Sequence, residues 1–121
     1  MRSRILFLAV LIVLIASLAA AGAEARFGVK VFPGATYDPD TSQWVSTNMK
    51  VDAACFRTNA TPGDVNEFYR KQFAVTEVTI SSRGGSLFKK GDIDITVQNP
   101  WTDMKTGQQH KDTLISIVKT K

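Results

Sequence analysis

Carboxylates are the residues of this 121-residue chain that are best spaced to do chemistry. Asp92 and Asp94 flank a single apolar residue, so in a strand both side chains point to one face, about 7 Å apart. Together with Asp103 or Asp112 on a paired strand, they would suit an acid–base pair or a hard cation. A solvated outer face that discourages edge-to-edge aggregation explains the same pattern and is the favoured interpretation. We therefore expect no cofactor, and Asp92 and Asp94 are the candidates if a metal binds.

The only histidine and the only cysteine lie in unlike surroundings. His110 belongs to a polar stretch near an expected hairpin tip, whereas Cys55 belongs to an apolar, strand-like segment. Two such residues cannot supply the three or four ligands of a zinc site, nor do they suggest a nucleophile with its base. We expect Cys55 to be a buried, inert thiol, and an intermolecular disulfide is the alternative if it faces outward. The sequence therefore favours a non-catalytic protein, with a small carboxylate- or cation-dependent hydrolase as the alternative.

Two tryptophans and a methionine are the candidate binding residues. Trp101 follows Pro100 in a loop-like stretch, and Met104 lies close to it in the sequence. Exposed apolar side chains grouped in this way are typical of binding patches. A Trp101 that folds over the edge of the core explains the same sequence and is the favoured interpretation. We name Trp101, Met104 and Trp44 as candidate binding residues.

One amphipathic helix is expected after Thr61. The Thr61 hydroxyl can cap the helix, Pro62 suits its first position and Asp64 favours the positive end of the helix dipole. An apolar stripe follows at helical spacing and comprises Val65, Phe68, Tyr69 and Phe73. A helix this short is not stable alone, so we expect it to pack on a sheet.

Alternating apolar and polar residues predict the strands of that sheet. Asp92–Gln98 alternates without a fault, and Ile93, Ile95 and Val97 form its inward face. With the segment Thr113–Lys119 it predicts one long hairpin, broken at Asn99–Pro100. Further strands are expected at Phe27–Phe32, weakly around Trp44–Thr47, and at Val51–Thr58, Val75–Ser81 and Leu87–Phe88. The predicted fold is α+β in two layers, with one amphipathic helix on an antiparallel sheet of about five or six strands.

The first 25 residues have the organisation of a secretory signal peptide. Arg2 and Arg4 precede an apolar run, Ile5–Leu18, whose helical length of about 21 Å is short of a ~30 Å bilayer core. Small residues follow and offer cleavage after Ala23 or, as we prefer, after Ala25. We therefore expect residues 1–25 to be removed and residues 26–121 to form a single exported domain without stable membrane insertion. An uncleaved signal anchor, which would make the chain a membrane-anchored accessory subunit, is the alternative.

Charge gives little indication of a nucleic-acid partner. The chain has 15 Lys and Arg against 11 Asp and Glu, and its positive residues are scattered. A nucleic-acid-binding protein usually gathers its basic residues on one face or along one helix. We expect no nucleic acid among the partners.

Three short segments resemble those of small exported bacterial domains of unassigned function. These domains show a "YPGA" turn, a short "F-x-T" strand and a "V-x-x-FY" helix, and here the corresponding segments are Phe32–Ala35, Phe56–Thr58 and Val65–Phe73. The resemblance implies a bacterial envelope location and a similar fold, and it carries no catalytic residues. We expect a periplasmic or secreted, non-catalytic domain that binds or supports an envelope protein or a small ligand.

Overall fold

The computed structural model describes residues 25–73, 76–80 and 85–121, without the side chains of residues 72–80. The chain forms two compact units, Met1–Pro33 and Gly34–Lys121. No helix within the described ranges is both long enough and apolar enough to cross a membrane.

The described part of the first unit contains a short β-hairpin whose strands have two residues each. Its strands β1 (Ala25–Arg26) and β2 (Val29–Lys30) pair in antiparallel fashion. Phe27 and Gly28 make the turn, with positive φ angles of 54° and 78°. Such a turn matches the twist of the flanking strands and is favoured by glycine. Of the predicted strand Phe27–Phe32, only Val29–Lys30 forms a strand, because the turn at Phe27 and Gly28 precedes it.

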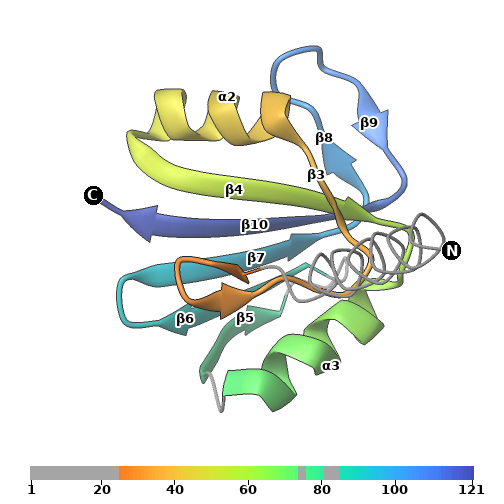
Figure 1. Cartoon of the computed structure of the whole chain (residues 1–121). Coiled ribbons are helices and arrows are strands. Elements are labelled where there is room, and N and C mark those ends of the chain that lie inside the picture. The colour runs from red at the N-terminus through yellow and green to blue at the C-terminus, as the bar shows by residue number, and fades with distance from the viewer. Residues whose placement is uncertain (1–24, 74–75, 81–84) are drawn as a thin grey trace, which may run out of the picture. The chain divides into compact units, whose positions relative to one another are not determined.

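The second unit is built on a six-stranded antiparallel sheet with the strand order β3-β4-β10-β7-β6-β5 (Figure 1). Its strands are β3 (Thr36–Tyr37), β4 (Val51–Thr58), β5 (Thr76–Ile80), β6 (Ser86–Lys90), β7 (Ile93–Gln98) and β10 (Thr113–Thr120). The α+β class and the antiparallel sheet are thus confirmed. The prediction of a single helix is wrong, because the described residues include two, α2 (Pro39–Met49) and α3 (Pro62–Phe73).

The predicted hairpin between β7 and β10 is confirmed, including its break. These strands pair from Leu114 with Gln98 to Lys119 with Ile93. Beyond the break at Asn99–Pro100, the chain continues as a separate two-stranded ribbon of β8 (Trp101–Thr102) and β9 (Gln109–His110).

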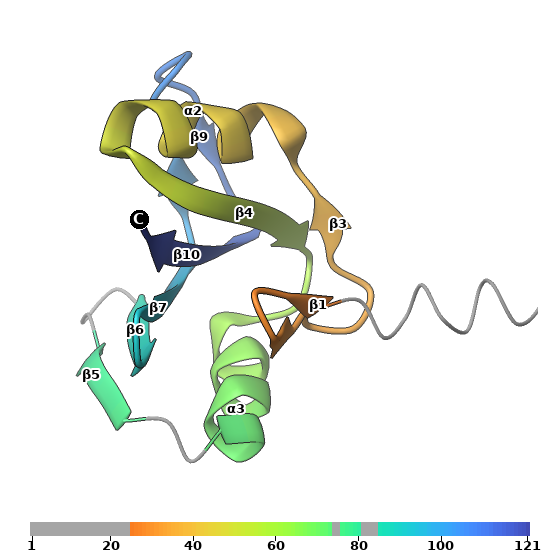
Figure 2. The same ribbon diagram turned by 60° about the vertical axis from the view of Figure 1, so that its left-hand side comes forward.

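Helix α3 has the start that the sequence predicts. The Thr61 hydroxyl accepts a hydrogen bond from the Asp64 N–H at 3.2 Å, and Pro62 begins the helix. Of the predicted stripe, Val65 and Tyr69 are fully buried and Phe68 is half-buried, whereas the Phe73 side chain lies outside the described residues. Figure 2 shows α3 beside the strands β6 and β7, which it also contacts.

Helix α2 replaces the weak strand predicted around Trp44–Thr47. Asp38 caps the helix, since its carboxylate accepts hydrogen bonds from the N–H and the hydroxyl of Thr41 at 3.0 and 2.8 Å. Pro39 takes the first position, and Lys50 ends the helix in a left-handed conformation. Many polar residues made this segment resemble a loop, but Asp followed by Pro is also a helix-start signal.

Polar contacts attach α2 to the edge of β4. Strand β3 pairs with β4 only at Arg57 and Phe56, so the rest of that edge lacks a strand partner. The Ser42 hydroxyl accepts the Cys55 N–H at 2.7 Å, and the Ser46 hydroxyl accepts the Ala53 N–H at 3.0 Å. Helix α2 therefore satisfies, through serine side chains, donors that a neighbouring strand would otherwise bind.

The register sorts the side chains of the sheet onto two faces. One of them, which we call the α3 face, carries Ala54, Phe56, Phe88, Ile95, Val97, Ile115 and Ile117, all buried. The rings of Tyr69 on α3 and Phe88 on this face lie 6.4 Å apart between centroids. The other, which we call the groove face, carries Cys55, Ser116, Thr96 and Leu87 on one rung across four strands.

Candidate functional site

A groove of about 610 Å³ lies on the groove face, and its volume is within the range of small-molecule sites. Its floor is formed by side chains of β6, β7 and β10. One wall comes from α2, and the other comes from the segment that includes β8. The lining residues are Asp40, Thr41, Trp44, Val45, Met49, Leu87, Asp94, Thr96, Gln98, Pro100, Trp101, Thr102, Asp103, Met104, Lys105, Thr106, Leu114, Ser116 and Val118.

The floor combines apolar side chains with a few polar groups. From β10 come Leu114, Ser116 and Val118, and from β7 come Thr96 and Gln98. Helix α2 lies along β4, the second strand of the order, and the side chains of β7 and β10 named above line the open part of this face. The outward positions predicted for β7 are thus the floor of the groove. Hydroxyl and amide groups among apolar neighbours are typical of ligand sites.

The three candidate binding residues all line this groove, although they come from separate segments. Trp44 is half-buried on α2, and Met104 is 69 % exposed on the opposite wall. Met49, at the end of α2, is 64 % exposed and adds a second methionine that the sequence analysis did not single out. Thioether side chains adapt to ligands of irregular shape.

Trp101 differs from the other two candidate binding residues because its side chain is buried. It is only 4 % exposed and belongs to a buried cluster with Cys55 and Leu114, against which Val45 of α2 packs. The favoured interpretation, with Trp101 folded onto the core, is therefore confirmed, and the interpretation of an exposed patch of Trp101 with Met104 is wrong. Its ring supports the wall from which Met104 projects.

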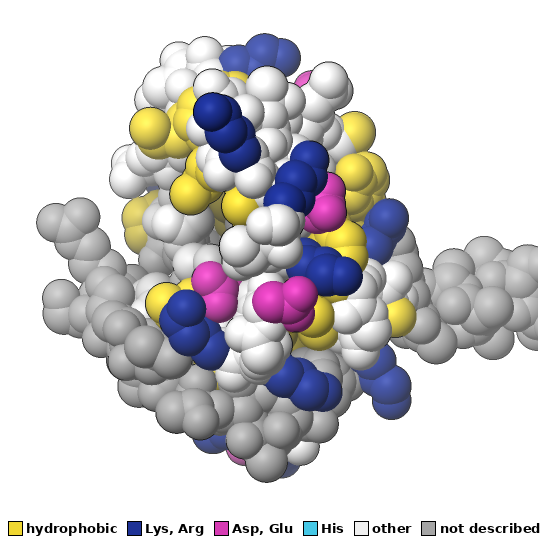
Figure 3. All heavy atoms as spheres, turned by 90° about the vertical axis from the view of Figure 1, so that its left-hand side faces the viewer, with side chains coloured by type: hydrophobic (Ala, Val, Ile, Leu, Met, Phe, Trp, Pro, Cys, Tyr) yellow, Lys and Arg dark blue, Asp and Glu magenta, His cyan; other side chains and the backbone are white. Residues whose placement is uncertain are grey.

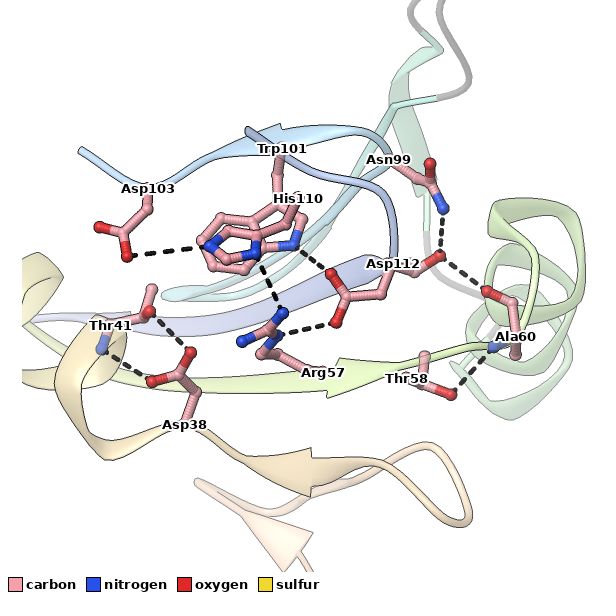
Figure 4. Close-up of polar contacts among 11 residues, drawn as sticks. Asp38, Thr41, Arg57, Thr58, Ala60, Asn99, Trp101, Asp103, His110 and Asp112 are labelled. Carbon is pink, nitrogen blue, oxygen red and sulfur yellow. Dashed lines mark hydrogen bonds and ion pairs between the residues drawn. The ribbon is translucent and has the colours of Figure 1, made fainter. Parts of the chain in front are cut away.

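An acidic residue joins β4 to the segment around Trp101 (Figure 4). One oxygen of Asp112 accepts the Arg57 Nε–H at 2.7 Å, and the other accepts the Trp101 indole N–H at 2.9 Å. The guanidinium carbon of Arg57 lies 5.2 Å from the centre of the Trp101 ring, within reach of a cation–π interaction. Asp112 thus satisfies a buried indole donor and a cation at once.

His110 completes this arrangement from β9. Its ring stacks on Trp101 with centroids 4.5 Å apart, and its Nδ1 lies 3.2 Å from an Arg57 nitrogen. Because guanidinium nitrogens only donate, Nδ1 is the acceptor in this contact, and the proton of the neutral ring is on Nε2. That nitrogen lies 4.0 Å from an Asp103 oxygen. His110 therefore links the two strands of the β8–β9 ribbon to β4.

Three pKa shifts follow from these surroundings. Burial by itself would raise the pKa of Asp112, but the hydrogen bonds from Arg57 and Trp101 outweigh it and hold that pKa below its usual range. The hydrogen bond to Asp112 raises the already high pKa of Arg57. Burial raises the pKa of the Cys55 thiol, which is fully buried with its sulfur 3.4 Å from the Ser116 hydroxyl. The expectation of a buried Cys55 is confirmed.

The structure does not assemble the carboxylate site that was the alternative to a solvated outer face. Asp94 pairs with Lys89 at 3.3 Å and lines the groove, whereas Asp92 is exposed in the turn before β7. Asp94 lies opposite Val118, near the end of β10, but Asp112 precedes the start of that strand. Within the described parts of the chain, no three His, Cys, Asp or Glu side chains lie close enough to hold a metal ion.

Arg57 and Asp112 were missed as partners of Trp101 because they are far apart in the sequence. Only the pairing of β4 with β10 brings them together.

Comparison of the chain with protein-family models, with curated proteins and with solved structures found no match.

Proposed function

We propose that this chain is a non-catalytic exported domain, periplasmic or secreted from a bacterium, that binds its partner in the groove. In this proposal the two-layer body of α3 and the sheet is the support, and the open part of the groove face is the working surface. The observation that carries the proposal is the convergence of Trp44 and Met104 on one groove whose floor combines apolar and polar side chains. Apolar side chains at the centre of a contact usually supply most of its binding free energy.

Capture of partners from the native envelope fraction tests the binding role. Trp44→Ala combined with Met104→Ala should lower the recovery of any specific partner at least tenfold, because both truncations remove contact area. Phe27→Ala is the matched control, since Phe27 is also an exposed aromatic residue but does not line the groove. Circular dichroism of each variant checks that the fold persists. Equal recovery with both variants would mean that the binding surface lies elsewhere.

Export rests on the organisation of the first 25 residues, and the intact mass of the native protein tests it. A mature chain should begin at Glu24 or at Arg26. Cleavage after Ala23 would keep both residues of β1, whereas cleavage after Ala25 would remove one of them. A full-length membrane-bound product would instead support the anchored accessory subunit.

A further inference from the structure

The groove differs in charge from the chain as a whole. The complete chain has a formal net charge of +4, yet the charged residues that line the groove are Asp40, Asp94 and Asp103 against Lys105. Acidic side chains therefore prevail where a ligand would bind. On the face seen in Figure 3, Lys and Arg side chains are interspersed with Asp and Glu side chains.

The three carboxylates come from three different elements. Asp40 lies in the first turn of α2, and Asp94 lies on β7. Asp103 follows β8, where its carboxylate accepts the Lys105 N–H at 2.9 Å. Lys89 offsets part of the charge of Asp94, but that ion pair has side chains 52 % and 35 % exposed and is screened by water. The local excess of negative charge persists because, among the described residues, a single lysine and three aspartates line the groove.

Between these carboxylates the lining combines apolar side chains with hydroxyl and amide groups such as those of Thr96, Gln98 and Ser116. Met49 and Trp44 on one wall and Met104 on the other are accessible, and Leu114 and Val118 form the floor between them. A ligand that fills this space needs an apolar body, and the surrounding charge favours a positive group on it. The same charge disfavours fatty acids and anionic lipids, whose carboxylate or phosphate would meet Asp40 and Asp94.

We propose that the groove binds a small cationic amphiphile, a molecule with an apolar body and one protonated or quaternary amine. This inference rests on the proposed binding role of the groove and adds the chemical class of the ligand. The volume of about 610 Å³ suits such a molecule better than a folded partner. The apolar body lies against the methionines and the apolar residues of the floor, and the amine lies against a carboxylate of the lining.

A matched series of probes tests the charge requirement. Decyltrimethylammonium, decanol and decanoate have the same chain and differ only in the head group. Both tryptophans line the groove, so tryptophan fluorescence and calorimetry below the micelle concentration report binding. We expect the cation to bind about three- to tenfold more tightly than decanol, and decanoate to bind least, as two screened carboxylates predict. Added sodium chloride should reduce the difference.

Paired charge substitutions locate the effect. Asp40→Asn with Asp94→Asn should weaken binding of the cation about three- to tenfold and leave decanol within twofold. Asp92→Asn with Asp64→Asn makes the same change of charge outside the groove lining and should alter neither affinity. The comparison separates a local contact from the total charge of the protein.

Three other outcomes would contradict the inference, and each has a different consequence for the proposed function. If decanol and the cation bind equally and the Asp40/Asp94 variant changes nothing, the ligand class is wrong, but the groove still binds apolar molecules. If no amphiphile binds while a Lys- and Leu-rich peptide does, the occupant is a protein segment. If no probe binds, the ligand class is wrong, and the envelope capture with Trp44→Ala and Met104→Ala decides separately whether the groove binds a partner.

Discussion

The two faces of the sheet differ in how completely they are covered. On the α3 face, large apolar side chains from four strands are fully buried, among them Phe56, Phe88 and Ile117. On the groove face, Trp44 is half-buried, Met104 is mostly exposed and polar side chains form part of the floor. The α3 face therefore buries large apolar side chains along four strands, whereas the groove face also retains accessible apolar side chains.

The positions of the helices explain this difference. Val65 and Tyr69 of α3 are fully buried, whereas α2 attaches to the edge of β4 through Ser42 and Ser46. A helix held at an edge by hydroxyl groups covers less of the sheet than a helix that packs across a face. The groove is what remains uncovered.

Phe88→Ala should show the difference most strongly. Removing this fully buried ring should lower the free energy of unfolding by about 3–5 kcal/mol, through lost burial and a cavity. Met104→Ala is the control on the groove face and should change it by less than about 0.5 kcal/mol. Chemical denaturation measures both. Comparable effects would mean that the two faces contribute equally to stability.

Asp112→Ala should have the next largest effect. It leaves the buried Trp101 indole N–H and the Arg57 guanidinium without their acceptor, which costs about 1.5–3 kcal/mol. Asp103→Asn keeps these two hydrogen bonds and should cost much less. A small loss with Asp112→Ala would mean that the Trp101 wall is held by packing alone.

The pH dependence of that effect has a defined sign. Because the folded-state pKa of Asp112 is lowered, its contribution to stability is present above the unfolded-state pKa of about 3.9 and is lost as pH falls through the folded value. The stability difference between wild type and Asp112→Ala should therefore shrink as pH falls from about 5 to about 3. A difference that stays constant over this range would contradict the role of the ionised carboxylate.

Ser42→Ala tests the edge attachment of α2 and should have the smallest effect of the three. The Cys55 N–H loses its acceptor, and we expect a loss of about 1–2 kcal/mol in the free energy of unfolding. Thr47→Ala, at an exposed position of the same helix, is the matched control and should be nearly neutral. Faster hydrogen exchange at the Cys55 amide would locate the change at the edge of β4.

Local signals in the sequence determined the strands β4, β7 and β10, the helix α3 and the break at Asn99–Pro100. Each depends on residues close together in the chain, such as the cap at Thr61 or the alternation through Ile93, Ile95 and Val97. The same signals placed Thr96 and Gln98 on the outer side of β7.

Only the tertiary structure decided the nature of α2 and the composition of the groove. Helix α2 has no apolar stripe that would reveal it, because its serines bond to the free edge of a strand that pairs with β3 for only two residues. At the buried Trp101, Asp112 accepts the indole N–H, and Arg57 from the distant strand β4 lies over the ring. Trp44 and Met104 line opposite walls of one groove because long-range strand pairing sets the distance between their segments. No local sequence pattern specifies that pairing.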